Sequence, residues 1–396
     1  MGLVGGPEVV ARCLRRIAEQ DGAIHAWVEV RPPTALESAA TEGPLAGIPF
    51  GAKDIFETRG CATEYGSPLY AGRKGETDAA VIAELRSQGA ILLGKTRTTA
   101  FASFDATPTS NPRAPGHTPG GSSSGSAAAV AAGMVPFALG TQTLGSVLRP
   151  ASYCGVCGFK PSFGLIPIEG VLPFAPSLDT VGFFTATAGE MNFLWSRGFG
   201  GTSDVSLRDL ARLRVPAEEP MVRAMEDTAC RLRAAGIRVD DMDTPAGWQA
   251  LTEAACTINT YEGARTHERR YRDFGERLGT RLAALVRRGL AMPAAEYEDA
   301  RALVDRMRTE ISRLFWEYPA ILSPAATGPP PAGLEFTGDP SANAPWTALG
   351  VPAIGVPLAG YDMPMGLQLT GAWGRDDAVV VVAAQAERLL APAVAA

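Results

Sequence analysis

The stretch PGGSSSGSAAAVAAG, residues 119–133, places two glycines and three serines directly before a run of small helix-forming residues. Alanine has a high helix propensity and serine is favoured where a helix begins, so a tight turn followed by a helix is expected. A flexible linker does not suit this pattern. A phosphate-binding loop needs a lysine after the glycines, and none lies nearby. Two interpretations of this stretch remain, a turn that carries catalytic residues and a helix cap without a catalytic role.

Residues 121–125 also satisfy the G-x-S-x-G pattern that presents the nucleophilic serine of α/β-hydrolases. In those enzymes a buried strand comes immediately before the first glycine, whereas residues 111–119 are rich in proline and turn-forming residues. The only downstream histidine is His267, in the charged helical stretch THERRYRD (266–273), where it is expected to face solvent. We therefore reject this interpretation.

A serine hydrolase with so few histidines needs another base, and a lysine can serve if burial keeps its amine neutral near pH 7. Lys53 ends the apolar, glycine-containing segment AGIPFGAK (46–53), which suits a buried position. Most lysines are surface residues, so an exposed Lys53 is the alternative.

A second turn, GTQTLGSVLRP (140–150), follows the strand-like run PFAL (136–139). Glycine beside serine in a turn leaves backbone N–H groups free to point at a developing oxyanion. A turn without chemistry is the alternative for this segment taken alone.

Composition excludes several classes of protein. Hydrophobic residues make up 46% of the 396 and charged residues 20%, which favours a folded globular chain. A net charge of −6 without a basic block argues against nucleic acid as a partner. The longest apolar runs fall short of a bilayer-spanning length and the N-terminus lacks a signal-peptide pattern, so no membrane association and a cytoplasmic location are expected.

Cysteine usage indicates neither a disulfide framework nor a metal site. The six cysteines are few and widely spaced for a chain of this length. Cys154 and Cys157 have C-x-x-C spacing, but a zinc site needs a second pair or histidines at ligand spacing, and neither is present. Packing in the core is the expectation for both thiols.

Hydrophobic periodicity predicts an α/β fold with a large mixed central β-sheet flanked by α-helices on both faces, in one domain over residues 1–396. The expected helices span 7–19, 78–89, 220–236, 246–257, 261–290, 295–317 and 377–391. The expected strands span 23–29, 90–93, 136–139, 319–323, 353–358 and 366–370.

Three segments resemble the amidase signature family in order and spacing, namely GGSSSGSAAAV (120–130), GTQTLGS (140–146) and PASYCGVCGFKP (150–161). The resemblance extends over nearly the whole chain. It includes a lysine segment (44–54), the turn SLDTVG (177–182) and C-terminal stretches around 337–346 and 366–369. It implies a single amidase domain on the amidase-signature fold, with a signature core at about 45–182 and a helical and C-terminal strand part at about 220–391.

The resemblance also implies the chemistry. Ser146 would be the nucleophile, Ser122 a bridging serine preceded by a cis peptide bond, and Lys53 the base of a Ser-cisSer-Lys triad that hydrolyses a small carboxamide through an acyl-enzyme. The oxyanion hole would be formed by the backbone N–H groups of Thr143, Leu144, Gly145 and Ser146. This chemistry uses no metal and no organic cofactor.

The sequence departs from the family pattern at several positions. Gln142 and Leu144 stand where many members carry Asp and Gly, and Arg149 lies three residues after Ser146 instead of two. Gln142 with residues 149–151 resembles the malonamidase type, whose substrates are small and acidic. We expect Arg149 to meet a carboxylate or carbonyl of the substrate, and pairing with a buried acid is the alternative.

Other functions share the same core. An amidotransferase subunit would pass ammonia to a substrate held by a partner, a biosynthetic acyltransferase would transfer the acyl group to an amine, and a binding protein would use the scaffold without catalysis. The resemblance implies a possible homodimer. The chain also looks shorter than typical members between about 190 and 220, a region that often helps to shape the substrate channel.

Overall fold

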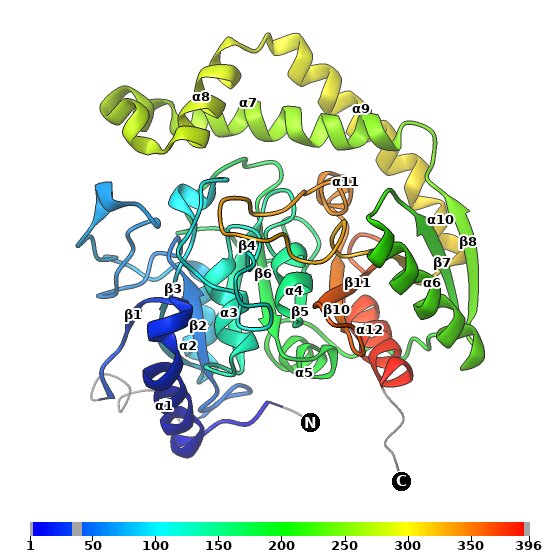
Figure 1. Ribbon diagram of the computed structural model, residues 1–396, viewed down its shortest axis with the longest axis horizontal. Coiled ribbons are helices and arrows are strands. Elements are labelled where there is room, and N and C mark those ends of the chain that lie inside the picture. Colours follow the sequence, from blue (N-terminus) through cyan, green and yellow to red (C-terminus); the bar gives the residue numbers. More distant parts are fainter. Residues whose placement is uncertain (1–2, 34–41, 392–396) are drawn as a thin grey trace.

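The computed structural model describes residues 3–33 and 42–391, and a sheet of eleven strands crosses it from one side to the other (Figure 1). The strands lie side by side in the order β1-β3-β2-β4-β6-β5-β10-β11-β9-β7-β8. They are β1 (Trp27–Val30), β2 (Pro49–Lys53), β3 (Ile91–Thr96), β4 (Phe137–Gln142), β5 (Cys157–Lys160), β6 (Thr180–Thr185), β7 (Asp209–Arg214), β8 (Arg238–Asp243), β9 (Ile321–Pro324), β10 (Ala353–Leu358) and β11 (Met365–Thr370).

The sheet is mixed. β2 runs parallel to both β3 and β4, and β7 runs parallel to β8 and β9. All the pairs between β4 and β9 are antiparallel, as is the pair of β1 with β3. The predicted mixed sheet is therefore confirmed.

Helices cover both faces of this sheet, as predicted. One buried cluster contains side chains of α1, α3 and α4, and the other contains side chains of α2, α5, α6 and α12. The helices are α1 (Pro7–Ile24), α2 (Ala80–Ser87), α3 (Ser124–Ala131), α4 (Leu148–Cys154), α5 (Ala188–Gly198), α6 (Glu219–Ala234), α7 (Trp248–Phe274), α8 (Thr280–Ala291), α9 (Ala294–Ser312), α10 (Leu314–Glu317), α11 (Ala344–Leu349) and α12 (Asp376–Leu390).

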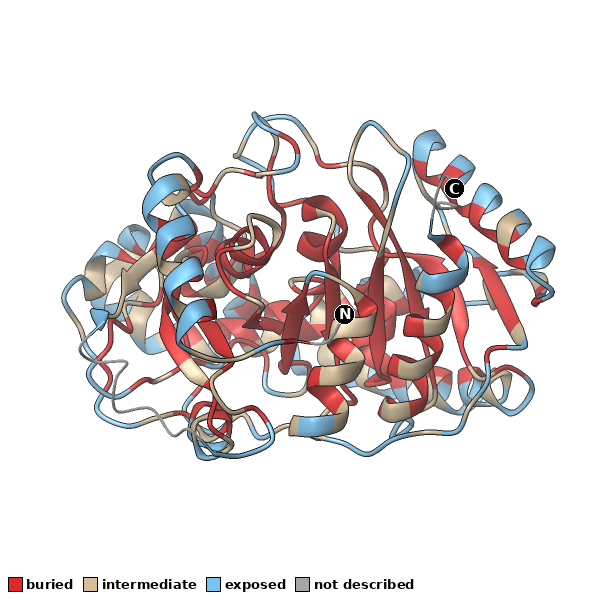
Figure 2. Cartoon of the chain, turned by 90° about the horizontal axis from the view of Figure 1, so that it is seen from below, coloured by how far each residue is buried: buried red, intermediate tan, exposed pale blue. Residues whose placement is uncertain are grey.

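The central strands are buried on both faces, which Figure 2 shows as red strands between helices with exposed outer sides. In β4, Phe137 and Leu139 enter one core cluster and Ala138 enters the other, because successive side chains of a strand point to opposite faces. The small residue at 138 lets the helix α3 pack closely, since α3 itself presents the small residues of 127–129 to the same cluster.

The helices α7, α8 and α9 form a separate layer across the top of Figure 1. The prediction of a helix break between 257 and 261 is wrong, because α7 continues from Trp248 to Phe274. Ile258 is buried and keeps the helical pattern going, and the chain instead turns at Gly275 and Gly279, both of which have positive φ.

Five strands, namely β2, β5, β6, β7 and β8, fall outside the predicted strand ranges. Two of these, β7 and β8, are neighbours in the sheet. They extend the sheet at the end farthest from β1. The outermost strand, β8, has the sequence RVDDMD, and most of its side chains are exposed or half-buried, so it lacks the apolar run of a central strand. The pattern of an edge strand is therefore easily missed.

Among the helices of residues 3–33 and 42–391, none combines the length and the apolar character needed to cross a bilayer.

We predict that Phe159→Ala lowers the free energy of unfolding by about 3–5 kcal/mol. Phe159 of β5 is fully buried, and its ring packs edge-on against Trp195 at 4.9 Å between centroids. Phe336→Ala is the matched control, because this phenylalanine is 48% exposed and the same truncation there is expected to change stability by about 0.5 kcal/mol or less. Urea denaturation of both variants measures the difference, and equal losses would contradict the packing described here.

Candidate active site

The sheet brings two of the predicted site segments to one edge. Lys53 is the last residue of β2, and Ser146 lies in the loop between β4 and α4. Because β2 and β4 are parallel neighbours, their carboxyl ends meet at the same edge of the sheet. Ser122 precedes α3 and reaches this edge from the glycine-rich turn.

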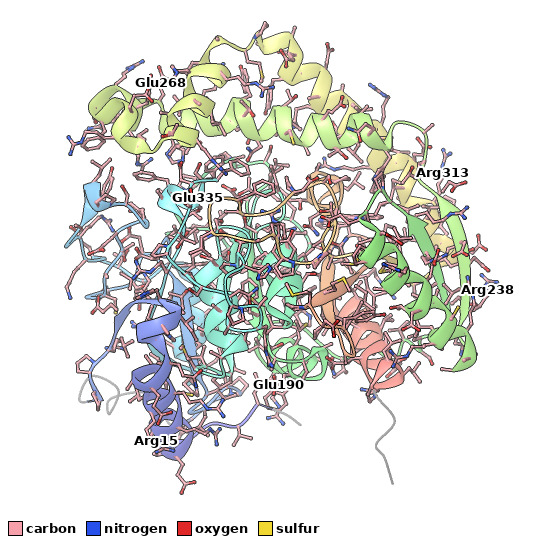
Figure 3. The ribbon with its side chains drawn as sticks, in the orientation of Figure 1. Arg15, Glu190, Arg238, Glu268, Arg313 and Glu335 are labelled. Atoms are coloured by element: carbon pink, nitrogen blue, oxygen red, sulfur yellow. The ribbon has the colours of Figure 1, made fainter. Side chains whose placement is uncertain are left out.

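The amine of Lys53 is buried, unlike most charged groups of the chain. Arg15, Arg238 and Arg313 extend from the surface (Figure 3), whereas Lys53 has no exposed area. Burial lowers the pKa of Lys53 from 10.5 to about 7, and the negative charge of Asp179 opposes part of that effect. The alternative of a solvent-exposed Lys53 is therefore excluded.

Three hydroxyl groups surround this amine. Lys53 Nζ lies 2.7 Å from Ser122 Oγ, 2.9 Å from Thr141 Oγ1 and 3.1 Å from Ser123 Oγ. Among the described residues no carboxylate lies within 4 Å of Nζ. Because a hydroxyl group can donate or accept, these three neighbours suit both the protonated and the neutral form of the amine.

Ser122 also contacts Ser146, since the backbone N–H of Ser122 donates a hydrogen bond of 3.1 Å to Ser146 Oγ. The two serines and Lys53 thus form one connected group. Ser146 is the more exposed of the two hydroxyl residues, which leaves its oxygen open to a substrate.

The cis peptide bond implied before Ser122 is absent, because the described residues contain no cis peptide bond. Gly120 and Gly121 instead turn the chain with φ of +82° and +57°. These left-handed conformations, which favour glycine, carry Ser122 to Lys53 across a trans bond. A Cβ on Gly121 would come within 3.0 Å of the Cα of Ser146, so this residue also permits the close approach of the two loops.

The residues 143–146, which we call the oxyanion loop, are held from behind by Gln142. Its Oε1 accepts hydrogen bonds from the backbone N–H groups of Val147 at 2.9 Å and Leu148 at 3.0 Å, where α4 begins. Within residues 3–33 and 42–391, the N–H groups of the oxyanion loop donate to no other group. They are available for a ligand.

The C-terminal part of the chain supports the same loop. Thr347 of α11 donates 2.8 Å to the carbonyl of Leu144 and accepts 2.9 Å from the side-chain amide of Gln142. Asn343 is bonded to Ala325 and lies so close to Gly145 that a Cβ there would come within 2.7 Å of Asn343 Oδ1. We did not identify Thr347 or Asn343 as site residues from the sequence, although Asn343 falls within a segment that resembles the family.

Arg149 lines the same cavity as Ser122 and Ser146, and it is 1% exposed. Its Nε donates 2.7 Å to the carbonyl of Thr337, and its Nη1 is buried without a partner. No carboxylate of the described residues lies within ion-pair distance, so the predicted alternative of pairing with a buried acid is wrong. Burial lowers the pKa of Arg149, and a substrate can still supply the missing anion.

The cavity is small, with a volume of about 20 Å³. Its lining also includes Ala102, Ser103 and Phe174. Phe101 and Ala102 have φ of +52° and +57°, which costs non-glycine residues of the order of 1–3 kcal/mol each and is commonly retained near functional sites.

The expectation that His267 faces solvent is wrong. It is fully buried between the rings of Phe101 and Phe174, at 5.8 Å and 5.3 Å between centroids. Burial lowers its pKa to about 3, so the ring is neutral at pH 7. The helix α7 turns His267 toward Phe174, which lines the cavity, and Arg270 packs over the ring of Phe101 on the same side, while Arg265 and Arg269 are exposed.

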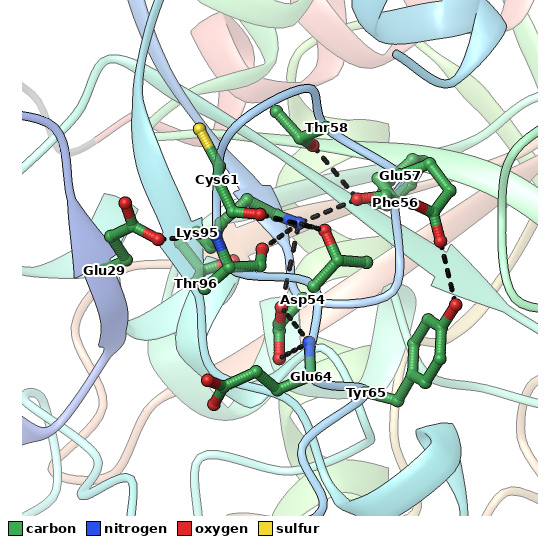
Figure 4. Close-up of polar contacts among 12 residues, drawn as sticks. Glu29, Asp54, Phe56, Glu57, Thr58, Cys61, Glu64, Tyr65, Lys95 and Thr96 are labelled. Atoms are coloured by element: carbon green, nitrogen blue, oxygen red, sulfur yellow. Dashed lines mark hydrogen bonds and ion pairs between the residues drawn. The ribbon is translucent and has the colours of Figure 1, made fainter. Parts of the chain in front are cut away.

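A second buried lysine fixes the segment that follows Lys53 (Figure 4). Lys95 Nζ donates to the carbonyls of Phe56 at 2.7 Å and Ala62 at 2.8 Å, and lies 3.7 Å from Asp54 Oδ1. Asp54 in turn accepts a hydrogen bond from the backbone N–H of Glu64. Residues 54–64 therefore form a closed turn that leaves Lys53 little freedom to move.

Cys154 and Cys157 are both buried in the core, and burial raises the pKa of both thiols. The part of the chain that the structure describes has no group of three His, Cys, Asp or Glu side chains placed to hold a metal ion.

Comparison with known proteins adds to this geometry. The family model for Amidase matches residues 8–201 and 210–380. A glutamyl-tRNA(Gln) amidotransferase subunit of Symbiobacterium thermophilum is 31% identical, over 96% of this chain and 93% of the relative.

Among solved structures, an amidase aligns with a TM-score of 0.86 at 28% identity, over 97% of this chain and 96% of the other. The peptide amidase of Stenotrophomonas maltophilia aligns with a TM-score of 0.83 at 26% identity, over 98% and 94%. The chain belongs to the amidase signature family of hydrolases, which act on carbon–nitrogen bonds.

Proposed function

We propose that this protein hydrolyses a small carboxamide through an acyl-enzyme on Ser146, with Ser122 as the bridging serine and Lys53 as the base. The observation that carries the proposal is the state of Lys53. Its amine is buried, its pKa is about 7, and it lies 2.7 Å from the hydroxyl of a serine whose own N–H contacts Ser146.

In the first step the proton of Ser146 passes to Ser122, the proton of Ser122 passes to Lys53, and Ser146 Oγ bonds to the amide carbon. A positioned base of this kind contributes about 10²–10⁴-fold. The N–H of Ser122 stabilises the negative charge that develops on Ser146 Oγ. The carbonyl oxygen becomes an oxyanion, which the free N–H groups of the oxyanion loop can bind, each worth about 3 kcal/mol.

In the second step Lys53, now protonated, returns a proton through Ser122 to the leaving nitrogen, and the carbon–nitrogen bond breaks. Ammonia or an amine departs. Water then attacks the acyl-enzyme by the same relay, which releases the carboxylic acid and restores Ser146. One lysine therefore acts as base and acid in turn.

The cavity supports a small substrate with a second polar group. The cavity is small, and polar side chains and the oxyanion loop form much of its lining. The unpartnered Nη1 of Arg149 lines this space, and a guanidinium suits recognition of a carboxylate or carbonyl. We therefore propose that Arg149 binds such a group on the substrate.

A second candidate function is that of an amidotransferase component that supplies ammonia to a partner. The observation in its favour is the 31% identity to the glutamyl-tRNA(Gln) amidotransferase relative across nearly the full length of both chains. Size-exclusion chromatography of the native protein and an assay of glutamine hydrolysis distinguish the amidotransferase function from the amidase function. Glutaminase activity that rises when co-purifying proteins are added would favour the amidotransferase, and amide hydrolysis by the isolated chain favours the amidase.

Acyl transfer to an amine would use the same relay, because an amine can attack the acyl-enzyme in place of water. Product analysis with an added amine distinguishes acyl transfer from hydrolysis. A carboxylic acid as the main product at physiological amine concentration supports hydrolysis.

We predict that Ser146→Ala lowers kcat for simple amides by about 10⁶-fold, because no acyl-enzyme can form. Ser152→Ala is the matched control, since Ser152 is a buried serine in α4 whose hydroxyl has no partner, and it is expected to keep wild-type activity. Ammonia release by the purified variants measures both. Full activity of Ser146→Ala would rule out the proposed nucleophile.

We predict that kcat/KM falls about tenfold for each pH unit below 7 and levels off above it. The pKa of Lys53 is about 7, so at lower pH the amine carries the proton that it must be free to accept. A profile of kcat/KM from pH 5 to 8 measures this fall, which we call the acid limb, and circular dichroism at each pH serves as a control for folding. A flat profile would exclude Lys53 as the base.

We predict that Arg149→Met lowers kcat/KM for a monoamide of a dicarboxylic acid by about 10–100-fold, the value of a hydrogen bond to a charged group. The matched neutral amide, with a methyl group in place of the carboxylate, is expected to change much less. Steady-state kinetics with both substrates measures the difference. Equal losses for the two amides would show that Arg149 does not recognise the carboxylate.

A further inference from the structure

One buried carboxylate joins the oxyanion loop to the wall of the cavity. Asp179, directly before β6, is 7% exposed. Its Oδ1 accepts a hydrogen bond of 2.6 Å from Thr143 Oγ1, and its Oδ2 accepts one of 2.7 Å from the backbone N–H of Phe174. Thr143 is the first residue of the oxyanion loop, and Phe174 lines the cavity.

The segment that carries Asp179 is anchored at a second point. Ser177 donates two hydrogen bonds to Glu262 of α7, 2.9 Å from its N–H and 2.5 Å from its hydroxyl. Glu262 also accepts a hydrogen bond of 2.8 Å from Tyr297 of α9. The carboxylate of Asp179 is thus held in place from the helical layer as well as from the sheet.

Asp179 has no cation in contact with it in the described part of the chain. The charged groups that act on it are Lys53, from β2, and Glu262, from α7. The sheet brings Asp179 near Lys53, because Thr180, the next residue, pairs with Gln142, and the residue before Gln142, Thr141, contacts Lys53 Nζ at 2.9 Å. His267 of α7 packs against Phe174 but is neutral at pH 7. Burial raises the pKa of Asp179 to about 6, so above that pH the carboxylate is mostly ionised.

We propose that Asp179 is a positioning residue, whose carboxylate fixes Thr143 at the start of the oxyanion loop and whose negative charge stabilises the protonated form of Lys53. This inference rests on the proposed function.

The charge matters because of what Lys53 must become during the reaction. In the resting site three neutral hydroxyl groups surround its amine, and no carboxylate of the described residues touches it. When the amine accepts a proton, a buried ammonium forms, which is costly without a compensating charge. Asp179 supplies that charge without touching the amine. Its charge therefore limits how far burial lowers the pKa of Lys53, and Lys53 can still release its proton because the two groups form no ion pair.

Asp179→Asn tests both parts of the proposal, since asparagine has nearly the same shape and no charge. We expect kcat to fall about tenfold, less than the loss of a whole oxyanion donor, because Thr143 is held less firmly. We also expect the acid limb of kcat/KM to move to lower pH by up to about one unit, because Lys53 loses its proton more readily without the neighbouring anion.

Thr143→Val is the matched control. It removes the hydroxyl that bonds to Asp179 and keeps the carboxylate, so kcat should fall while the acid limb stays at the wild-type pH. Thr143→Ser should restore kcat, because it restores the hydroxyl. A shift of the acid limb of kcat/KM in Asp179→Asn but not in Thr143→Val would show that the charge of Asp179 acts on Lys53, apart from its hydrogen bond to Thr143. If Asp179→Asn does not fold, Asp179→Ser, which is smaller and also uncharged, replaces it.

An acid limb that does not move in Asp179→Asn, or that moves to higher pH, would overturn the electrostatic part of the inference. Unchanged kcat in both Asp179→Asn and Thr143→Val would overturn the positioning part. Failure of the proposed function is a distinct result, because it appears as retained activity in Ser146→Ala whatever the behaviour of Asp179.

Discussion

A lysine amine whose pKa is lowered by burial among hydroxyl groups is the constraint on which the candidate site depends. The folded state holds Lys53 with a pKa of about 7 and the unfolded chain holds it near 10.5, so the folded state binds fewer protons between these values. The free energy of unfolding therefore rises with pH across this window, and the cost of burying Lys53 is greatest below pH 7. The cost arises because Lys53 ends β2, a strand in which all five residues are buried.

The second requirement is a loop whose backbone donors stay unpaired. Such a loop loses hydrogen bonds that an ordinary turn would make, so other groups must hold its shape. Gln142 holds the beginning of α4, and Thr347 holds the carbonyl of Leu144, some 200 residues away in the chain. The C-terminal part of the chain thus supports the loop through α11, which lies within the second range, 210–380, that the family model matches.

The sequence was sufficient for a mixed sheet with helices packed on it, for six of the eleven strands and for the segments that meet at the site, because apolar periodicity and glycine–serine turns are local signals. The sequence was insufficient where contacts between distant segments determine the surroundings of a side chain. His267 looked solvated because its neighbours are charged, yet α7 turns its ring between two phenylalanines. Asp179 lay in a recognised segment, but nothing local indicates that its carboxylate reaches Thr143. The resemblance implied a cis bond before Ser122, whereas the chain reaches Ser122 through two successive glycines in left-handed conformation and a trans bond.

Two buried charges flank the oxyanion loop without forming an ion pair of their own. Asp179 is bonded to Thr143 at its start, and Arg149 lies against Gly145, where a Cβ would come within 2.6 Å of its Nη1. The proposed reaction creates a negative oxygen at the loop and a positive amine on Lys53. Asp179 acts on the amine of Lys53, whereas Arg149 lines the cavity in which the substrate is proposed to bind. Because both charges are in place before the reaction begins, binding the substrate and protonating Lys53 need little rearrangement of the protein.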